Sequence, residues 1–512
     1  MALLGLAGVA LIASWAFLHR HGIADADAMV MAAGLAHGLQ PGVPFRESLL
    51  YGRLISPGFY SFFHVVLPRL VHDRAQIVDA LNGIAAGAAG VTAAALYLLY
   101  RASFGRPAAI ACTLIVALSP VAWESGTSFH PIGIALPLMV MAGLAFAWSE
   151  RSRRGRAWWA IATLLAAAAL LMRNEVALAF PAALVAAALS PGRWRTWLRA
   201  LVAEGVALGI YLIAAQRVAS ATAGEGGLAG WATGFASSYL RPAAIGRSAV
   251  WASFALGPVT VALAAAGLRR AAREPEAKVR RGLAVALALA LPAILLWLPN
   301  TTAVLRHYLL ALPALVWIAG AAWLERMPRA GLVAVTLAVL IGNLLIPEAL
   351  YAGYARLRPG SHLWPNGTFL SSHRLTADAI DRARRLELAA RPEALGEGAG
   401  AANRGLFAQV DWRGYGHVLY GLALADTPWT LRSTSRPFEG SVLYQYRIGT
   451  REVRLLLAQL DWAAPGSPQR EGLRRVLAGE AAHARQAGLA VIVPHEVTDQ
   501  GLLAPAQAHP PY

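Results

Sequence analysis

Long uninterrupted apolar runs fill most of the first two thirds of the chain. Polar or charged gaps separate the runs, and each run is near the length of about 20 residues that a helix needs to cross a bilayer. The runs are Ala2–Phe17, Ile77–Tyr100, Pro107–Ala122, Ile132–Trp148, Ala157–Met172, Val176–Leu189, Leu201–Ala215, Ala249–Leu268, Leu283–Leu298, Leu309–Leu324 and Gly331–Ile346. This pattern predicts an all-α polytopic membrane bundle of about eleven transmembrane helices, residues 1–346.

The pattern changes after residue 350, where polar and apolar residues mix as in soluble proteins. Short β-type runs and two longer helical runs alternate there. The expected strands are Gly405–Val410, Trp429–Thr434, Ser441–Ile448 and Leu489–Pro494, and the expected helices are Leu375–Ala389 and Arg470–Gln486. We therefore expect a soluble α/β or α+β domain over residues 351–512.

The segment between the first two runs, residues 19–76, is too long for a simple connector. It contains a helical pattern at Ala26–Leu39 and an aromatic stretch at Phe59–His64, with arginines nearby. Aromatic and basic residues together favour helices that lie in the membrane interface. We treat this segment as a long first external loop of the membrane domain.

Composition agrees with a membrane protein. Hydrophobic types make up 57% of the chain and charged types 14%, which excludes a disordered chain and disfavours an ordinary soluble enzyme. The formal net charge of +17 would suggest nucleic acid in a soluble protein, but here the basic residues lie mostly in short gaps between the runs. The single cysteine, Cys112, lies inside a run and excludes an internal disulfide.

The distribution of basic residues predicts an orientation. Alternate gaps, from residue 101 to residue 329, hold 17 arginine and lysine residues, whereas the intervening gaps hold 10 over a much greater length. Positively charged loops remain in the cytoplasm. The N-terminus is then cytoplasmic and the C-terminal domain extracytoplasmic, in a bacterial-type inner or plasma membrane.

Three carboxylates are the candidate catalytic residues: Asp25, Asp27 and Glu124. The two aspartates follow the first run directly, where either can accept a proton from a hydroxyl or an amine. As a pair they can also hold a divalent cation, or one of them can simply cap the helix at Ala26–Leu39. Glu124 lies among apolar neighbours in a predicted external loop, where it can orient an acceptor.

Arg306 and Tyr308 are the candidate phosphate-binding residues. A planar guanidinium forks onto phosphate oxygens, although an arginine at a membrane surface can instead extend to lipid headgroups. Tyr308 can equally be an interfacial belt residue. The nearby Arg173 and Glu175 are interpreted as an internal ion pair at a helix end. No P-loop is present in the sequence, which argues against an ATP-driven pump.

Several short patches, in order, resemble those of the GT-C glycosyltransferases, a superfamily that includes the protein O-mannosyltransferases and the lipid A aminoarabinose transferases. The patches are Asp25 after the first span with Gly38 and Tyr51-Gly52 following, then Arg101–Arg106, then Leu118–Pro120 with Glu124, and finally Arg306–Tyr308 leading into Leu312-Pro313. The span count and the external C-terminal domain are also similar. As architecture, the resemblance covers residues 1–346.

The resemblance implies a glycosyltransferase that moves a sugar from a polyprenyl-phosphate donor to a glycan, lipid or protein acceptor on the extracytoplasmic side. It implies an inverting displacement with Asp25 as the first choice of base and Asp27 as the second. The chain departs from the family at His130-Pro131, where relatives commonly have an acidic residue, so Glu124 is the only carboxylate of that loop. Metal dependence stays open.

Two other functions remain as alternatives. A secondary transporter or lipid flippase would usually contain inverted repeats and buried midplane charges, and neither is evident in the sequence. A non-catalytic membrane assembly factor would use residues 351–512 as a binding module, because that region carries no recognisable catalytic motif.

Overall fold

The computed structural model describes most of the chain. The described residues are 1–21, 26–43, 56–127, 129–220, 245–273, 276–299, 305–357, 383–391, 405–439, 441–458 and 467–493. The chain divides into two compact units, which are described separately below. Unit 1 is Met1–Arg20, Gly52–Phe62 and Asn82–Ala349, and unit 2 is His21–Tyr51, Phe63–Leu81 and Leu350–Tyr512. Neither unit is one continuous segment.

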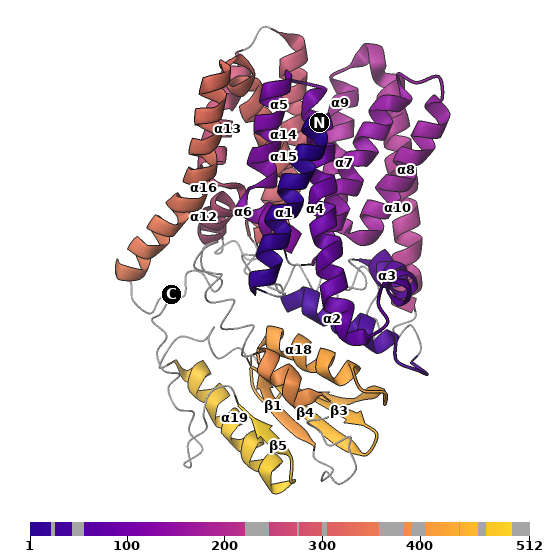
Figure 1. The fold of residues 1–512 in the computed structure, drawn as a ribbon, viewed down its shortest axis with the longest axis vertical. Helices are drawn as coiled ribbons and strands as arrows, with labels where there is room; N and C mark the ends of the chain where they lie inside the picture. Colours follow the sequence, from indigo (N-terminus) through magenta and orange to yellow (C-terminus); the bar gives the residue numbers. More distant parts are fainter. Residues whose placement is uncertain are drawn as a thin grey trace. The chain divides into compact units, whose positions relative to one another are not determined.

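Unit 1 is helical (Figure 1). Its α-helices are α1 (Ala2–His21), α4 (Ile77–Arg101), α5 (Arg106–Ala117), α6 (Pro120–Thr127), α7 (Pro131–Ser149), α8 (Gly155–Met172), α9 (Phe180–Ala188), α10 (Trp194–Ser220), α12 (Ile245–Leu256), α13 (Pro258–Ala272), α14 (Ala277–Trp297), α15 (Leu312–Ala322) and α16 (Arg329–Leu357). The 3-10 turns in this unit are η3 (Asn174–Ala179), η4 (Pro191–Arg193), η6 (Leu305–Tyr308) and η7 (Leu324–Arg326). Helix α3 (Pro57–Leu70) belongs partly to each unit, and so do α4, whose residues 77–81 are in unit 2, and α16, whose residues 350–357 are in unit 2.

Six helices in the described residues are long and apolar enough to cross a membrane, or seven with the bent pair α12–α13. The chain is thus a multi-span membrane protein. The expected number of about eleven is larger because several apolar runs are interrupted. The run at residues 107–122 breaks into α5 and α6 before Pro120, and the runs at 176–189 and 309–324 form helices of 9 and 11 residues. The length of an apolar run does not reveal where the helix within it breaks.

The break between α12 and α13 is held by a side chain from α16. Gly257 has a φ of +84°, and the two helices meet at 93°. Asn343 Oδ1 accepts the backbone N–H groups of Val259 and Thr260 at 3.0 and 3.2 Å. Its Nδ2 donates to the Thr260 hydroxyl at 2.8 Å. Freed backbone groups in a membrane need such partners, so Asn343 makes the bend possible.

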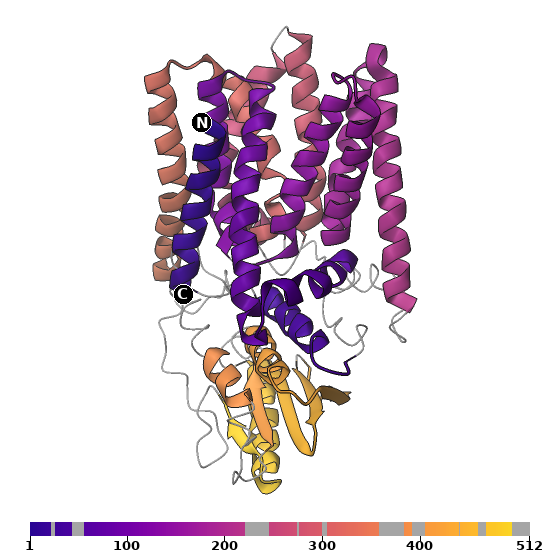
Figure 2. The ribbon, with the colours of Figure 1, turned by 45° about the vertical axis from the view of Figure 1, so that its right-hand side comes forward.

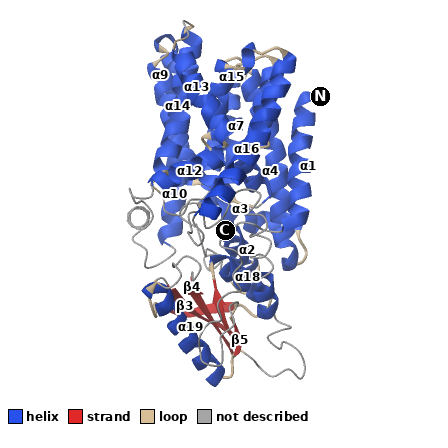
Figure 3. Ribbon diagram, turned by 90° about the vertical axis from the view of Figure 1, so that its left-hand side faces the viewer, coloured by secondary structure: helices blue, strands red, loops and turns tan. Residues whose placement is uncertain are grey.

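Unit 2 is built around a mixed sheet, seen in red in Figure 3. Its strands are β1 (Leu406–Val410), β2 (Trp429–Ser435), β3 (Ser441–Ile448), β4 (Arg451–Ala458) and β5 (Ala490–Ile492), in the order β2-β3-β4-β1-β5. Strands β2, β3 and β4 are antiparallel, whereas β1 runs parallel to β4 and β5. The α/β or α+β fold predicted for the C-terminal region is confirmed as a mixed α/β sheet.

Helices cover both faces of this sheet (Figure 2). Helix α19 (Pro468–Gln486) packs Leu473 and Leu477 against Phe407, Leu443 and Leu456. Helix α18 (Trp412–Ala423) lies on the opposite face, where Tyr415 contacts Tyr444 and Tyr446. The alternation of side chains along β3 explains this division, because Leu443 and Tyr444 point to opposite faces.

Part of the first loop folds with the C-terminal region in unit 2. Helix α2 (Ala26–Gly38) confirms the helix predicted at Ala26–Leu39, and it packs against α18. A Cβ on Gly416 would lie 2.9 Å from the backbone nitrogen of Val30, so the two helices approach closely. The 3-10 turn η2 (Arg74–Gln76) also joins this unit, since Arg74 donates to Asp426 at 2.8 Å. The predicted boundary at residues 346–351 does not anticipate this grouping.

Candidate functional site

A buried polar cluster in unit 1 begins where α8 ends. Arg173 leaves the helix in an extended conformation, and η3 starts at the next residue. Arg173 Nε donates to Glu175 Oε1 at 2.8 Å, and Nη2 donates to the same oxygen. The other carboxylate oxygen of Glu175 lies 3.3 Å from His307 Nδ1. The predicted internal pair of Arg173 and Glu175 is therefore confirmed, and His307 joins it from η6.

The protonation states in this cluster follow from burial and charge. Burial alone would raise the pKa of the Glu175 carboxyl, but the charge of Arg173 and the hydrogen bonds from His307 and Arg173 outweigh it and lower the pKa to about 2. Burial lowers the pKa of His307 more than the Glu175 charge raises it. His307 is thus a neutral ring at pH 7, and it donates its Nδ1–H to the ionised Glu175.

Two aromatic residues fix the position of η6. The ring of His307 stacks on Trp297, the last residue of α14, with centroids 3.5 Å apart and 9° between the planes. The Tyr308 hydroxyl donates to the backbone carbonyl oxygen of Trp297 at 3.3 Å. Arg306, between these contacts, is buried with 8% of its surface exposed. The guanidinium is thus not a solvent-exposed surface group.

His130 lies at the N-terminus of α7 and belongs to the same cluster. Helices α7 and α8 are consecutive and pack side by side, so the start of α7 and the end of α8 lie at the same end of the pair (Figure 1). Burial lowers the pKa of His130, and the charges of Arg306 and Arg173 lower it further. Sequence reasoning did not assign a role to His130; its place before Pro131 was the available signal.

The structure describes some of the predicted site residues and leaves others undescribed. Arg306 and Tyr308 lie together in η6. Asp27 is in the first turn of α2 in unit 2, and its side chain is half-buried. Asp25 lies outside the described residues, as does the side chain of Glu124, whose backbone is part of α6. The predicted catalytic and phosphate-binding roles of these residues stay predictions.

The surroundings of Asp27 are set by α2. His37, on the last turn of this helix, stacks on Trp429 at 3.9 Å and bonds Gln40 Oε1 at 2.6 Å through Nδ1. Gln40 in turn donates to the Ala425 carbonyl oxygen at 2.6 Å. An acidic side chain in the first turn of a helix is stabilised by the positive end of the helix dipole. These contacts hold the helix that carries Asp27 onto the β2 and α18 side of unit 2.

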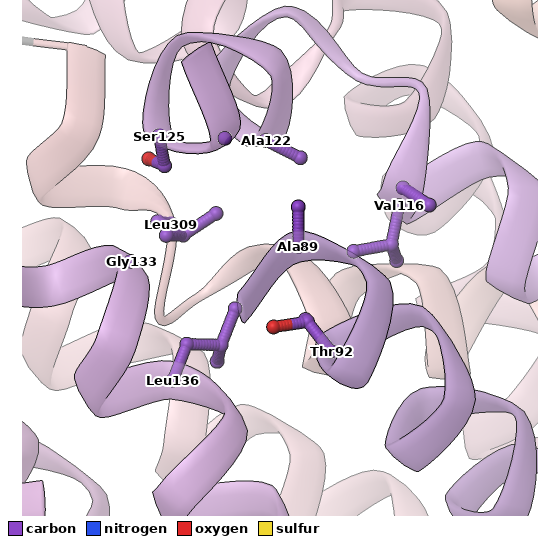
Figure 4. Close-up of a pocket in the computed structure, with 10 residues that line it drawn as sticks. Ala89, Thr92, Val116, Ala122, Ser125, Gly133, Leu136 and Leu309 are labelled. Carbon is purple, nitrogen blue, oxygen red and sulfur yellow. The ribbon is translucent and has the colours of Figure 1, made fainter. Parts of the chain in front are cut away.

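Unit 1 also contains a small cavity with a mostly apolar lining (Figure 4). Its lining includes Ala89, Gly133 and Leu309. About 30 Å³ is open to the centre of a water molecule, which is room for one or two waters but not for a sugar. The hydroxyls at its edge are already bonded to backbone carbonyls, from Thr92 to Ala88 at 2.7 Å and from Ser125 to Val121 at 2.9 Å. The cavity as it stands is no substrate chamber.

Within the described residues, no three histidine, cysteine, aspartate or glutamate side chains are grouped so that they could hold a metal ion.

Part of the chain matches a known protein family. Residues 78–218 match the family described as dolichyl-phosphate-mannose-protein mannosyltransferase. This stretch contains His130, Arg173 and Glu175, and the match confirms the predicted resemblance to the GT-C glycosyltransferases. No curated protein sequence matches the chain.

Among solved structures, the oligosaccharyltransferase of Archaeoglobus fulgidus, crystallised with a tethered acceptor peptide, is similar at 13% identity and a TM-score of 0.45. The similarity covers 82% of this chain, which spans only 63% of that protein.

Proposed function

We propose that this protein is an integral-membrane glycosyltransferase of the GT-C type, which transfers a sugar from a polyprenyl-phosphate donor to a glycan, lipid or protein acceptor. The observation that carries the proposal is the family match over residues 78–218. The buried cluster of Arg173, Glu175 and His307, at the ends of spanning helices, supports it. Ionisable groups at such positions are usually functional.

Arg306 is proposed to bind the phosphate of the donor. A guanidinium makes two parallel hydrogen bonds to phosphate oxygens, and these are stronger in a buried site than in water. The stack of His307 on Trp297 supports this role because it limits the freedom of the residue next to Arg306. Tyr308 is proposed as a second phosphate contact, for which its hydroxyl exchanges its bond to the Trp297 carbonyl oxygen.

Asp25 or Asp27 is proposed as the general base. The carboxylate takes the proton from the acceptor hydroxyl or amine while the acceptor attacks the anomeric carbon from the face opposite the phosphate. The bond from the acceptor to this carbon forms, and the bond from the carbon to the phosphate oxygen breaks. Its electron pair leaves with the polyprenyl phosphate, and the anomeric configuration inverts. Glu124 is proposed to orient the acceptor.

Turnover of a polyprenyl-phosphate sugar by the purified full chain tests this function. We expect Asp25→Asn or Asp27→Asn to lower kcat by about 10²–10⁴-fold, the usual contribution of a general base. Arg306→Gln should raise KM for the donor by about 30-fold or more, because it removes a buried charge partner of the phosphate.

The matched control is Asp73→Asn. Asp73 belongs to the same loop, and its carboxylate accepts the backbone N–H of Ala75 as a helix cap. Asparagine caps equally well, so turnover should not change. Full activity of the variant that combines Asp25→Asn and Asp27→Asn, at normal expression, would contradict the proposed base.

The proposed orientation places the arginine-rich gaps in the cytoplasm and unit 2 outside. Two exposed positions report on it in a Cys112→Ser background, namely Ser433 on β2 and Arg153 between α7 and α8. In intact cells, an impermeant thiol reagent should label Ser433→Cys, and it should label Arg153→Cys only after the membrane is opened. The reverse pattern would invert the topology and remove the proposed external site.

A further inference from the structure

His130 is held in one position by its neighbours on both sides. Its ring Nδ1 accepts the backbone N–H of Ile132 at 3.2 Å, and Pro131 starts the helix that it caps. The preceding residue is also fixed, because the Phe129 N–H donates to Asn82 Oδ1 at 3.3 Å. Only 2% of the surface of His130 is exposed. The ring therefore has little freedom to turn.

The capping bond also determines which ring nitrogen carries the proton. Nδ1 acts as an acceptor, so a neutral His130 carries its hydrogen on Nε2. Burial and the charges of Arg306 and Arg173 keep the ring neutral by lowering its pKa. Nε2 is buried and has no hydrogen-bond partner among the described residues. A buried donor without an acceptor is costly, and in native proteins it calls for an explanation.

The surroundings of this donor favour an anion as its partner. Arg173 and Arg306 are close enough for their positive charges to act on the ring. Helix α7 contacts η3, and α6 contacts η6, so these elements meet at one end of the helices. The N-terminus of α7, a helix of 19 residues, adds the positive end of its dipole. The guanidinium of Arg306, a helix N-terminus and one N–H match the acceptor oxygens of a phosphate, whereas Arg173 already bonds Glu175 through Nε and Nη2.

We propose that His130 is a phosphate-binding residue, whose Nε2–H donates to an oxygen of the lipid-linked phosphate beside Arg306. The inference rests on the proposed function and deepens it, because it names a side chain that fixes where the phosphate lies.

Two substitutions separate the donor of His130 from its cap. Asparagine places its amide where Nδ1 lies, so His130→Asn keeps a good helix cap and loses the Nε2 donor. Glutamine reaches the position of Nε2, so His130→Gln keeps a donor and loses the cap. Binding of decyl phosphate, inorganic phosphate and decanol to the full chain in maltoside detergent can be measured by calorimetry, with the unfolding temperature measured in parallel.

We expect decyl phosphate to bind the wild-type chain at least about tenfold more tightly than His130→Asn, with similar unfolding temperatures. His130→Gln should bind as the wild type does, with a lower unfolding temperature. Decanol should bind weakly throughout.

Three outcomes would overturn the inference. Equal binding of decyl phosphate by wild type and His130→Asn would show that Nε2 of His130 donates no hydrogen bond to the phosphate. Equal weakening in both variants, together with lower unfolding temperatures, would make His130 structural only. Tighter binding of inorganic phosphate than of decyl phosphate would assign the site to free phosphate. Failure of the wild type to bind decyl phosphate and to turn over any donor would instead defeat the proposed function itself.

Discussion

At the scale of single residues, the sequence predicted an ion pair between close neighbours but not the contacts that this pair makes with distant residues. Arg173 and Glu175 are two positions apart, so their pairing could be predicted from local spacing. The addition of His307, more than a hundred residues away, could not, because only the fold brings η6 to η3. The only signal in the sequence for His130 was its place before Pro131. Its buried, cationic surroundings depend on Arg173 and Arg306, which are distant in sequence.

A second buried carboxylate, in unit 2, gives a prediction about pH. Glu387 accepts from Arg391 at 2.8 Å and contacts His417 Nδ1 at 2.8 Å. Burial raises the pKa of Glu387, but the bonds and charges of His417 and Arg391 lower it below its usual 4.5 in total. A group with a lowered folded pKa stabilises the fold above its unfolded pKa, and that contribution is lost as the pH falls through the folded value.

Glu387→Gln should therefore destabilise the protein by about 2 kcal/mol near pH 7, and the difference from wild type should shrink towards pH 3. Thermal unfolding followed through the β-sheet signal measures this. The control is Glu452→Gln, because the Glu452 pair with Arg454 is half-exposed and should contribute under about 1 kcal/mol. A pH-independent difference for Glu387→Gln would show that Glu387 is not ionised in the folded protein.

At the scale of elements, uninterrupted patterns were predicted well and interrupted ones were not. Strand β3 was predicted with its observed ends, and α19 to within two residues at its start. Strand β4 and helix α18 were missed. The turn that signals β4 is only Gly449 and Thr450, with a φ of +57° at the glycine. Helix α18 contains three glycines, which weaken a helical pattern although they allow close packing.

The bend between α12 and α13 gives a prediction at this scale. Asn343→Leu removes the acceptor of two backbone N–H groups at Val259 and Thr260. Unbonded backbone groups in an apolar bundle cost about 1–3 kcal/mol each, so the unfolding temperature in detergent should fall clearly.

Thr336→Val is the matched control on the same helix. The Thr336 hydroxyl is buried and has no hydrogen-bond partner among the described residues, so its loss should be neutral or slightly stabilising. Equal unfolding temperatures for Asn343→Leu and wild type would mean that other groups satisfy the bend.

At the scale of the whole molecule, the pattern of apolar and polar runs, together with composition, was enough to predict a multi-span membrane protein with a C-terminal α/β region. The pattern could not predict that α2 folds with that region. The contacts that join them connect residues nearly 400 positions apart, such as Gln40 and Ala425. The local sequence of either segment does not indicate that it packs against the other. The apolar character of α2 was instead consistent with a helix in the membrane interface.

This grouping leads to a prediction for a chain that ends at Ala349. Without α18, α2 loses the close contact at Gly416 and the stack of His37 on Trp429, so its buried Met29 and Leu35 lose covering surface. We expect the amides of α2 to lose protection from hydrogen exchange in the truncated chain. If Asp27 is the base, turnover should fall in parallel.

Residues 350–512 produced as a separate polypeptide should restore the protection of α2 and the turnover, because the contacts are non-covalent. Full protection of α2 in the truncated chain would show that unit 1 alone orders it, and full turnover would separate unit 2 from catalysis.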